Sequence, residues 1–443
     1  MTLTTRAVVA SGGWPLVGHT LALLRRPLEF LASLPAQGDL VEIRVGLQRM
    51  WVVCCPDLTH RVLRDGRAFD KGGPFFDQMR IILGHGLGTC AHGPHQRQRR
   101  LLQPAFSRDR LAVYATEMSR QLDTVLGTWR DGQVIDVLAA MDEITTRVSA
   151  RTLFTTHLSP QQSADLLHSL TALLEGAFLR MIMPTWLARA PLAVNRRFNR
   201  ALSTADALTY GIINAYRHDG VDHGDLLSMM LAARDEHGDA LTDTELRDQV
   251  FTFWLAGTET TASLLAWSLH LLGQHPQAAR RVQTEVDGVL GGRVAGHDDV
   301  ARLDYTTRVL TETLRLYPPG WLFTRVNTTE ATLADRTLPA GTVLLYSPYL
   351  IHRRGDLYPD PDHFDPDRWL PDHTTTLPRG AVVPFGGGAR RCIGDTFAML
   401  EATLVLATIT ARWQLDPLPG AITRPRPRAT LRPRPLHMRL RQR

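Results

Sequence analysis

The longest apolar stretch of the chain follows Thr242 and predicts one buried helix. Thr242, with Glu245 three positions later, gives the capping-box pattern with which many helices begin. Apolar side chains then fall on almost every face of the expected helix, which is typical of a helix surrounded by protein. Its middle departs from this pattern, because Gly257, Glu259 and Thr260 place a weak helix former, a carboxylate and a hydroxyl among apolar neighbours. Such departures are expected at functional sites.

Elsewhere, the apolar positions predict many helices and a few short strands. Alternation over residues 39–55 predicts a β-hairpin, and the stretch 326–352 also predicts strands. Helical spacing dominates from residue 110 to 240. We therefore expect a mainly α fold with small β-sheets (α+β). Length alone would suggest about three domains, but no linker divides the chain. A single large domain should therefore occupy residues 14–443, behind a flexible N-terminus at residues 1–13.

Residues 70–94 are rich in glycine and predict an irregular segment that carries apolar side chains, among them Phe75, Phe76 and Leu83. A long loop with such side chains is costly unless it covers something. The segment is therefore interpreted as a lid over an apolar ligand. The alternative is ordinary packing of a loop on the core.

A single cysteine, Cys392, stands in a glycine-rich segment just before an expected helix. Phe385, Gly388 and Arg390 precede it by seven, four and two positions, and Gly394 follows by two. A helix N-terminus and nearby cations favour the thiolate form of cysteine. The glycines let the backbone come close to a bulky, flat group. The alternative, an inert buried cysteine in a turn, does not account for this combined spacing.

Two further pairs of polar residues have helical spacing. His95 and Arg99 share one face of an expected helix, where two donors suit a carboxylate, although a solvated basic face is the alternative. Glu312 and Arg315 lie three positions apart on a helix that a double proline ends. Such a pair is common on protein surfaces, so spacing alone gives it no function.

Composition narrows the class of protein. The 443 residues are 44% hydrophobic and 21% charged, which is typical of a globular chain. The formal charge of +6 comes from arginines dispersed among carboxylates, with Lys71 the only lysine, so we expect no nucleic-acid partner. Four cysteines without paired spacing predict no disulfide framework. Because no apolar run opens the chain, we expect a soluble, cytoplasmic protein without a signal peptide or membrane anchor.

The segment around Cys392 resembles the haem-ligand loop of the cytochrome P450 family. The hexapeptide 256–261, Ala-Gly-Thr-Glu-Thr-Thr, matches that family's helix motif position by position. The resemblance implies the cytochrome P450 fold and haem b, with the Cys392 thiolate as the axial ligand of its iron. It also implies that Glu259 and Thr260 are catalytic and form a proton relay, with Gly257 leaving room for dioxygen.

Further residues are assigned through the same resemblance. Arg368, in the phrase Asp-Arg-Trp where Glu-Arg-Phe is usual, would complete a structural triad with Glu312 and Arg315. Four basic side chains would meet the two haem propionates: His95, Arg99, Arg325 and Arg390. The remaining implied haem contacts are Phe385, Gly388 and Gly394. The implied substrate contacts are Phe75, Phe76, Leu83, Phe178, Leu255, Ala256, Trp321 and Leu322.

These residues predict a monooxygenase that activates O2 and hydroxylates C–H bonds of an apolar small molecule. The segment 246–263 is similar to that of actinobacterial terpenoid oxidases, which favours a terpenoid or other secondary metabolite; a fatty acid or a macrolide is the alternative. Two other functions were weighed: haem-thiolate coupling or rearrangement without oxygen insertion, and a non-catalytic haem or gas-binding module. The intact pair Glu259 and Thr260 disfavours both.

Electrons must come from separate proteins, because no Gly-x-Gly-x-x-Gly unit for NAD or flavin is visible. We expect a ferredoxin and a ferredoxin reductase as donors. Arg97, Arg100, Arg390 and Arg391 would make the surface on the cysteine side positive and favour an acidic ferredoxin. The protein itself is expected to be a monomer.

Overall fold

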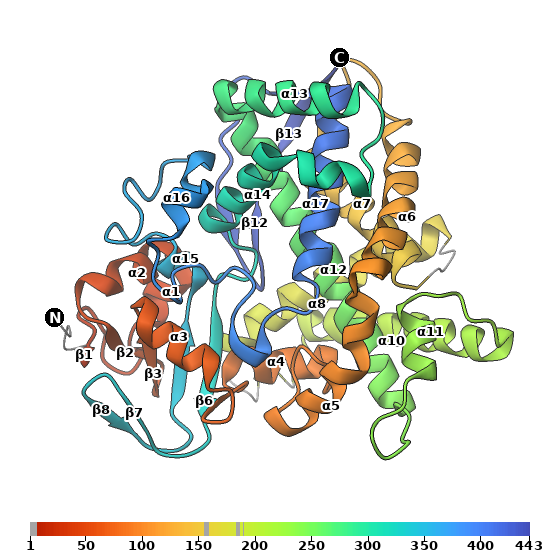
Figure 1. Ribbon diagram of the computed structural model, residues 1–443. Helices are drawn as coiled ribbons and strands as arrows, with labels where there is room; N and C mark the ends of the chain where they lie inside the picture. The colour runs from red at the N-terminus through yellow and green to blue at the C-terminus, as the bar shows by residue number, and fades with distance from the viewer. Residues whose placement is uncertain (1–6, 155–158, 183–186, 189) are drawn as a thin grey trace.

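Helix α12 (Asp243–Gln274) runs through the middle of the protein, where the apolar pattern predicts a buried helix (Figure 1). Both halves of the capping box are present. The Thr242 hydroxyl accepts a hydrogen bond from the Glu245 amide (3.2 Å), and the Glu245 carboxylate accepts one from the Thr242 amide (2.9 Å). The computed structural model describes residues 7–154, 159–182, 187–188 and 190–443.

Most of the described chain is helical, and the helices gather around α12 (Figure 1). The α-helices before it are α1 (Thr20–Arg25), α2 (Pro27–Ser33), α3 (Pro56–Arg64), α4 (Pro74–Leu83), α5 (His92–Leu102), α6 (Arg108–Leu126), α7 (Val137–Thr152), α8 (Pro160–Ile182), α10 (Ala193–Asp219) and α11 (Leu226–Ala232). Those after it are α13 (Pro276–Leu290), α14 (Asp304–Leu316), α15 (Pro348–Ile351), α16 (Pro371–Thr374) and α17 (Asp395–Arg412). Short 3-10 helices are η1 (Leu34–Ala36), η2 (Gln103–Phe106), η3 (His297–Arg302), η4 (Pro366–Trp369) and η5 (Gly388–Arg390).

The largest sheet lies on the opposite side from the helix bundle, at the left of Figure 1. Its strand order is β1 (Ala7–Val9), β2 (Leu40–Val45), β3 (Gln48–Val53), β9 (Val343–Tyr346), β6 (Phe323–Asn327) and β4 (Phe69–Asp70). A second sheet orders β10 (Trp413–Pro417), β13 (His437–Gln442) and β5 (Val134–Asp136). Two hairpins pair β7 (Ala331–Leu333) with β8 (Arg336–Leu338), and β11 (Pro425–Pro427) with β12 (Leu431–Pro433). The predicted mainly α fold with small sheets is thus confirmed.

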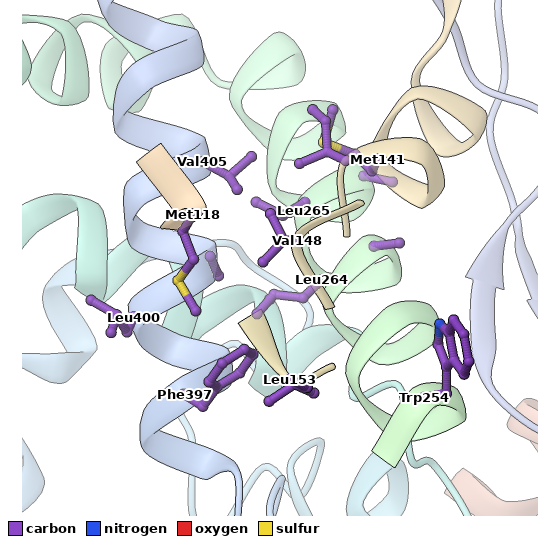
Figure 2. Close-up of a cluster of buried hydrophobic side chains, with 14 of the residues drawn as sticks. Met118, Met141, Val148, Leu153, Trp254, Leu264, Leu265, Phe397, Leu400 and Val405 are labelled. Atoms are coloured by element: carbon purple, nitrogen blue, oxygen red, sulfur yellow. The ribbon is translucent and has the colours of Figure 1, made fainter. Parts of the chain in front are cut away.

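The main core lies where α12 packs against α7 and α17 (Figure 2). Leu264 and Leu265 of α12 meet Val148 of α7 and Val405 of α17 in one buried cluster. Each fully buried side chain of this kind contributes roughly 1.5–3 kcal/mol. This packing fixes α12 relative to the segment that precedes α17, which carries Cys392.

Two expected segments differ from the structure. The stretch 70–94 is not irregular throughout, because residues 74–83 form α4, a helix that begins with proline and ends at Gly84 with φ +53°. Within the segment expected to be flexible, residues 7–9 form β1, which pairs in parallel with β2; residues 1–6 lie outside the described residues. No helix of the described chain combines the length and apolar character needed to cross a membrane.

Candidate active site

A large cavity lies between α12, α4, β6 and the loop that carries Cys392. The space between its atoms, including solvent at its open side, has a volume of about 1850 Å³. Its lining is mainly apolar, and it includes Ala256, Glu259 and Thr260 of α12 as well as Cys392. Apolar members of the lining are Phe75, Phe76, Met79, Leu83, Leu87, Leu174, Phe253, Leu255 and Phe323. The structure therefore brings the cysteine and the polar break of α12 to one cavity.

The Cys392 loop folds tightly against α3. Gly388 has φ +62°, and a Cβ atom there would lie 2.2 Å from the Leu63 carbonyl oxygen, so only glycine fits. The Cys392 amide donates to the Phe385 carbonyl (2.9 Å), and Gly394 caps α17. The Cys392 side chain is exposed toward the cavity that it lines. The protein around the cavity raises the pKa of its thiol through desolvation, and the Gly394 amide and Arg99 oppose this rise.

Basic residues crowd one part of the cavity. Lys71, His95, Arg99, Arg325 and Arg390 all line it. Burial, with Arg325 and Arg390, lowers the pKa of Lys71 to about 7. Burial, Arg390 and Lys71 lower the pKa of His95 to about 3, so His95 is a neutral hydrogen-bonding group at neutral pH rather than the cation expected. A ligand that brought carboxylates here would relieve this repulsion, which fits the propionates of haem.

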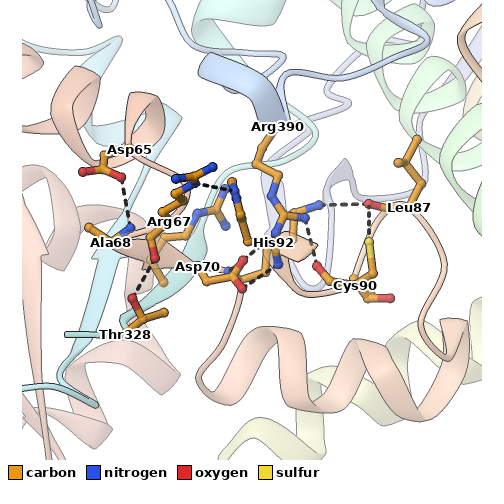
Figure 3. Close-up of polar contacts among 12 residues, drawn as sticks. Asp65, Arg67, Ala68, Asp70, Leu87, Cys90, His92, Thr328 and Arg390 are labelled. Carbon is orange, nitrogen blue, oxygen red and sulfur yellow. Dashed lines mark hydrogen bonds and ion pairs between the residues drawn. The ribbon is translucent and has the colours of Figure 1, made fainter. Parts of the chain in front are cut away.

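Arg390 is anchored between two segments that meet beside the cavity (Figure 3). Its Nη1 donates to the Cys90 carbonyl (2.9 Å), and its Nη2 pairs with the Asp70 carboxylate (2.5 Å). Asp70 also accepts from the His92 amide (2.8 Å) at the start of α5. The Arg390 Nε is buried and makes no hydrogen bond to the described residues. Arg390 is therefore held in place by these contacts, and its Nε is left without a partner among the described residues.

The two polar side chains in the middle of α12, Glu259 and Thr260, have hydrogen-bond partners in different parts of the structure. The Thr260 hydroxyl donates to the Ala256 carbonyl (2.6 Å), one turn back in its own helix. Glu259 instead accepts from Arg432 Nη1 (2.9 Å). Burial raises the pKa of Glu259, and Arg432 opposes that shift. A Cβ atom on Gly257 would lie 3.0 Å from the Ser149 hydroxyl, so this glycine also permits the close approach of α7.

Glu312 and Arg315, near the C-terminal end of α14, meet Arg368 of η4. Arg315 donates to both Glu312 oxygens (2.8 and 2.7 Å) and to three backbone carbonyls. Arg368 is looser: its Nε lies 3.5 Å from Glu312. Trp369, where the family's phrase usually has phenylalanine, donates its indole N–H to Glu312 (2.9 Å). The departure from the usual phrase therefore adds a hydrogen bond to the cluster.

The expected substrate contacts separate into two groups. Phe75, Phe76, Leu83, Leu255 and Ala256 line the cavity. The structure does not place the other three there: Phe178 packs beneath Arg428, with the guanidinium 5.3 Å from its ring, and Trp321 and Leu322 pack in a second apolar cluster. The Trp321 indole donates to the Arg428 carbonyl (2.7 Å). These positions were assigned by resemblance alone, and no apolar pattern distinguishes a cavity wall from a core.

The arginines expected to make the cysteine side positive are paired with acids. Arg97 meets Asp235 and Glu245. The other pairs are Arg100 with Glu236, Arg390 with Asp70, and Arg391 with Asp395. The sequence shows the cations, but it does not show these partners, which lie far away along the chain in all but the last pair. The expected positive surface is therefore largely neutralised at these four positions.

Three residues of the site are not indicated by the sequence patterns described above. Lys71 lines the cavity beside Phe76, and its ammonium donates to the Gly88 carbonyl (2.7 Å). It is the only lysine of the chain, a signal that could have drawn attention to it. Thr430, at the tip of the β11–β12 hairpin, also lines the cavity, and Arg432 of that hairpin pairs with Glu259. The proline-rich C-terminal segment gave no indication of this contact.

Residues 10–439 match the model of the family described as Cytochrome P450. The chain belongs to the cytochrome P450 family. It is 49% identical over 436 residues to cyclooctatin synthase of Streptomyces melanosporofaciens, covering 98% of this chain and 95% of that protein. It is 44% identical to pentalenene oxygenase of Streptomyces avermitilis, covering 98% and 97%. The crystal structure of the cytochrome P450DA haem domain superposes with a TM-score of 0.90 at 27% identity, covering 100% and 99%.

Membership in this family makes the protein a P450 monooxygenase, with a haem whose iron is bound by a cysteine thiolate. The residues that line the cavity also fit a haem, independently of the family match. Cys392 is the one cysteine that lines it among the described residues, and the crowded basic side chains lack enough acids to balance them. The tight turn at Gly388 holds this loop against α3, while Cys392 lines the cavity.

Proposed function

We propose that this P450 hydroxylates an apolar terpenoid, with Cys392 holding the iron of haem b. The observation that carries the proposal is the composition of one cavity, in which an apolar wall, the Glu259–Thr260 pair and Cys392 meet. Relatives support the substrate class. Their names include cyclooctat-9-en-7-ol 5-monooxygenase of Streptomyces melanosporofaciens, 45% identical over 413 residues, and pentalenene oxygenase. Haem b needs no second thiol for attachment, and among the described lining residues only Cys392 is a cysteine.

The protein positions the substrate and excludes water. Phe75, Phe76, Leu83, Leu255 and Ala256 form an apolar wall that offers no ion pair to a hydrocarbon. Burying each methylene of the substrate against it contributes about 0.8 kcal/mol. Lys71, His95, Arg99, Arg325 and Arg390 would bind the two haem propionates. Gly388 and Gly394 shape the loop that presents Cys392, and Phe385 packs beside it.

When bound, the haem supplies dioxygen activation and oxidation of a C–H bond. The net reaction takes up O2, two electrons and two protons, and it converts C–H to C–OH with release of water. Glu259 and Thr260 would deliver the protons. Glu259 is buried beside a charged partner and can change its protonation state. The Thr260 hydroxyl, now bonded to Ala256, would turn to the cavity that it lines to pass a proton.

The electrons would come from a ferredoxin and its reductase. Since the arginines first expected to receive the ferredoxin are paired, the supporting cations are different ones. Arg61 and Arg64 on α3 are exposed and form no ion pair among the described residues, and α3 packs against the Cys392 loop at Gly388. An acidic ferredoxin would dock here by charge complementarity. A reducing cytoplasm suits the protein, since Cys54, Cys55 and Cys90 are free thiols.

The ligand assignment is tested by the spectrum of the reduced, carbon monoxide-bound protein. Wild type should give the red-shifted Soret band of thiolate ligation, and Cys392→Ala should lose it. Cys90→Ala is the matched control, because Cys90 is a buried cysteine near Arg390 that does not line the cavity. A thiolate spectrum that persists in Cys392→Ala would overturn the assignment.

The substrate class is tested by titrating the haem spin state with cyclic terpenes, fatty acids and macrolides. A response confined to fatty acids or macrolides would contradict the terpenoid proposal.

A further inference from the structure

One ion cluster joins the polar break of α12 to the C-terminal hairpin. Arg432 of β12 donates from Nη1 to Glu259 and pairs through Nη2 with Asp142 of α7. The side chains are 10% exposed at Glu259, 15% at Arg432 and 20% at Asp142. The cluster therefore leads from a residue that lines the cavity to a carboxylate that is more accessible to solvent.

The hairpin that carries Arg432 is fastened to α12 itself. The Leu431 carbonyl accepts hydrogen bonds from the Ser263 hydroxyl (2.8 Å) and from the Trp267 indole (3.1 Å), both further along the helix from Glu259. At the other strand, Arg426 pairs with Glu175 of α8 (3.2 Å). These contacts fix β12 beside the helix, so Arg432 reaches Glu259 from a set direction. Because Arg432 also pairs with Asp142, a movement of Arg432 would disturb that ion pair too.

The cluster is only partly satisfied. Glu259 Oε2 is buried and makes no hydrogen bond of good geometry to the described residues, and neither does Arg432 Nε. A buried carboxylate that served only to hold the fold would be expected to use both oxygens. Arg432 holds Glu259 at Oε1. The Thr430 hydroxyl also interacts with the carboxylate, but Oε2 makes no well-formed hydrogen bond to the described residues, which leaves it open to proton exchange.

We infer that Arg432 is a positioning residue for proton delivery, holding Glu259 beside Asp142 in the orientation from which it passes protons toward Thr260. The inference rests on the proposed function, because it assigns a control element to the same proton relay. In each transfer, Glu259 gives up its carboxyl proton on the Thr260 side. It then regains one from solvent on the Asp142 side, so the proton count of the cluster is restored.

The charges around Glu259 make this role distinguishable from simple structural support. Burial raises the pKa of Glu259; Arg432 lowers it, Asp142 raises it, and the Thr430 hydroxyl lowers it. Asp142 in turn faces Asp136 as well as Arg432. Removal of Arg432 should therefore shift the pKa of Glu259 upward, whereas removal of Asp142 should shift it downward. A general loosening of the structure would move the two variants in the same direction.

The test uses the full-length, haem-loaded protein and the infrared band of the Glu259 carboxylic acid, assigned by its loss in Glu259→Gln. Titration of this band with pH should give a higher midpoint in Arg432→Gln and a lower one in Asp142→Asn. Arg426→Gln is the matched control, since it removes an ion pair of the same hairpin away from Glu259, and its midpoint should equal that of wild type. Midpoints that move together, or an unchanged midpoint in Arg432→Gln, would overturn the positioning role.

Turnover separates this inference from the proposed function. With the terpene that gives the largest spin shift, and with a ferredoxin and its reductase as electron donors, the product formed in a fixed time should fall roughly 100-fold in Glu259→Gln. The loss should be about tenfold in Arg432→Gln, and Arg432→Lys should recover part of it. Unchanged product yield in Glu259→Gln would refute the relay and, with it, the role of Arg432. A large loss in Glu259→Gln beside wild-type yield in Arg432→Gln would refute only the role of Arg432. Should Arg432→Gln fail to bind haem, Arg432→Lys and Asp142→Asn still decide the question.

Discussion

Two buried glutamates, each paired with arginine, show how differently one chain uses the same chemistry. Glu312 is fully buried, and its two oxygens accept from Arg315, the Asp365 amide and the Trp369 indole. Glu259 accepts from Arg432, and its second oxygen makes no well-formed hydrogen bond to the described residues. Both oxygens of Glu312 are therefore hydrogen-bonded, whereas only one oxygen of Glu259 is.

This difference indicates that the Glu312 cluster supports the fold, whereas the Glu259 cluster can take part in proton transfer. A buried ion pair repays its desolvation only when hydrogen bonds satisfy both partners, as they do for Glu312 and Arg315. That cluster also joins distant segments, because Arg315 donates to the His352, Pro361 and His363 carbonyls. Around Glu259 the satisfaction is partial, and the exposure of its partners increases outward to Asp142. Incomplete pairing lowers stability locally, but it leaves a proton free to move.

The largest expected effect comes from making the same substitution in both clusters. Glu312→Gln should lower the free energy of unfolding by about 3–5 kcal/mol, because it leaves the buried Arg315 without its counter-charge. Glu259→Gln should lower it by less than about 1 kcal/mol, because Arg432 keeps Asp142 as a partner. Urea unfolding of the two haem-loaded variants beside wild type measures both values. Equal losses would remove the distinction between a structural and a functional cluster.

Much of this arrangement could be predicted from the sequence, where local pattern carries the information. The capping box, the apolar faces of α12 and the polar break within it lie in one continuous segment. The glycine spacing around Cys392 likewise fixes its loop. Arg432 could not be found in this way, since 173 positions separate it from Glu259 and its neighbours are prolines and other arginines.

The same limit explains why three of the expected substrate contacts do not line the cavity. Phe178 and Trp321 are apolar, and both belong to the second apolar cluster. Whether a side chain faces a cavity or a core depends on how distant segments of the chain pack together. Phe178 turns to Arg428 of the C-terminal hairpin, and Trp321 donates to that residue's carbonyl. The prediction of an irregular segment at residues 70–94 was wrong for another reason. Glycines and prolines flank α4, so the sequence does not show the helical pattern of its ten residues clearly.

A third buried carboxylate, with no cation beside it, extends the comparison. Glu401 of α17 is fully buried, and neither oxygen makes a well-formed hydrogen bond to the described residues. Burial raises its pKa well above the usual range, and only the Thr261 hydroxyl opposes this. Glu401 is therefore protonated in the folded protein. Its contribution to stability is complete below the pKa of the unfolded chain and is lost as pH rises toward the folded pKa.

Glu401→Gln should therefore gain stability relative to wild type as pH rises. Above the unfolded pKa of about 4.3, the difference should grow by about 1.4 kcal/mol for each pH unit until the folded pKa is reached. Thermal unfolding of both proteins at pH 5 and pH 6 measures this slope. A pH-independent difference for Glu401→Gln would mean that its carboxyl is ionised in the fold.

The smallest expected effect tests whether completeness itself stabilises the Glu312 cluster. Trp369→Phe keeps the aromatic ring but removes the indole donor to Glu312, so the free energy of unfolding should fall by roughly 1 kcal/mol. The loss is modest because Arg315 and the Asp365 amide still bind both oxygens. Trp321→Phe is a matched control for a half-buried indole bond that goes to a backbone carbonyl instead of a carboxylate. A smaller loss in Trp369→Phe than in Trp321→Phe would show that this fourth donor is redundant, and that the cluster is complete without it.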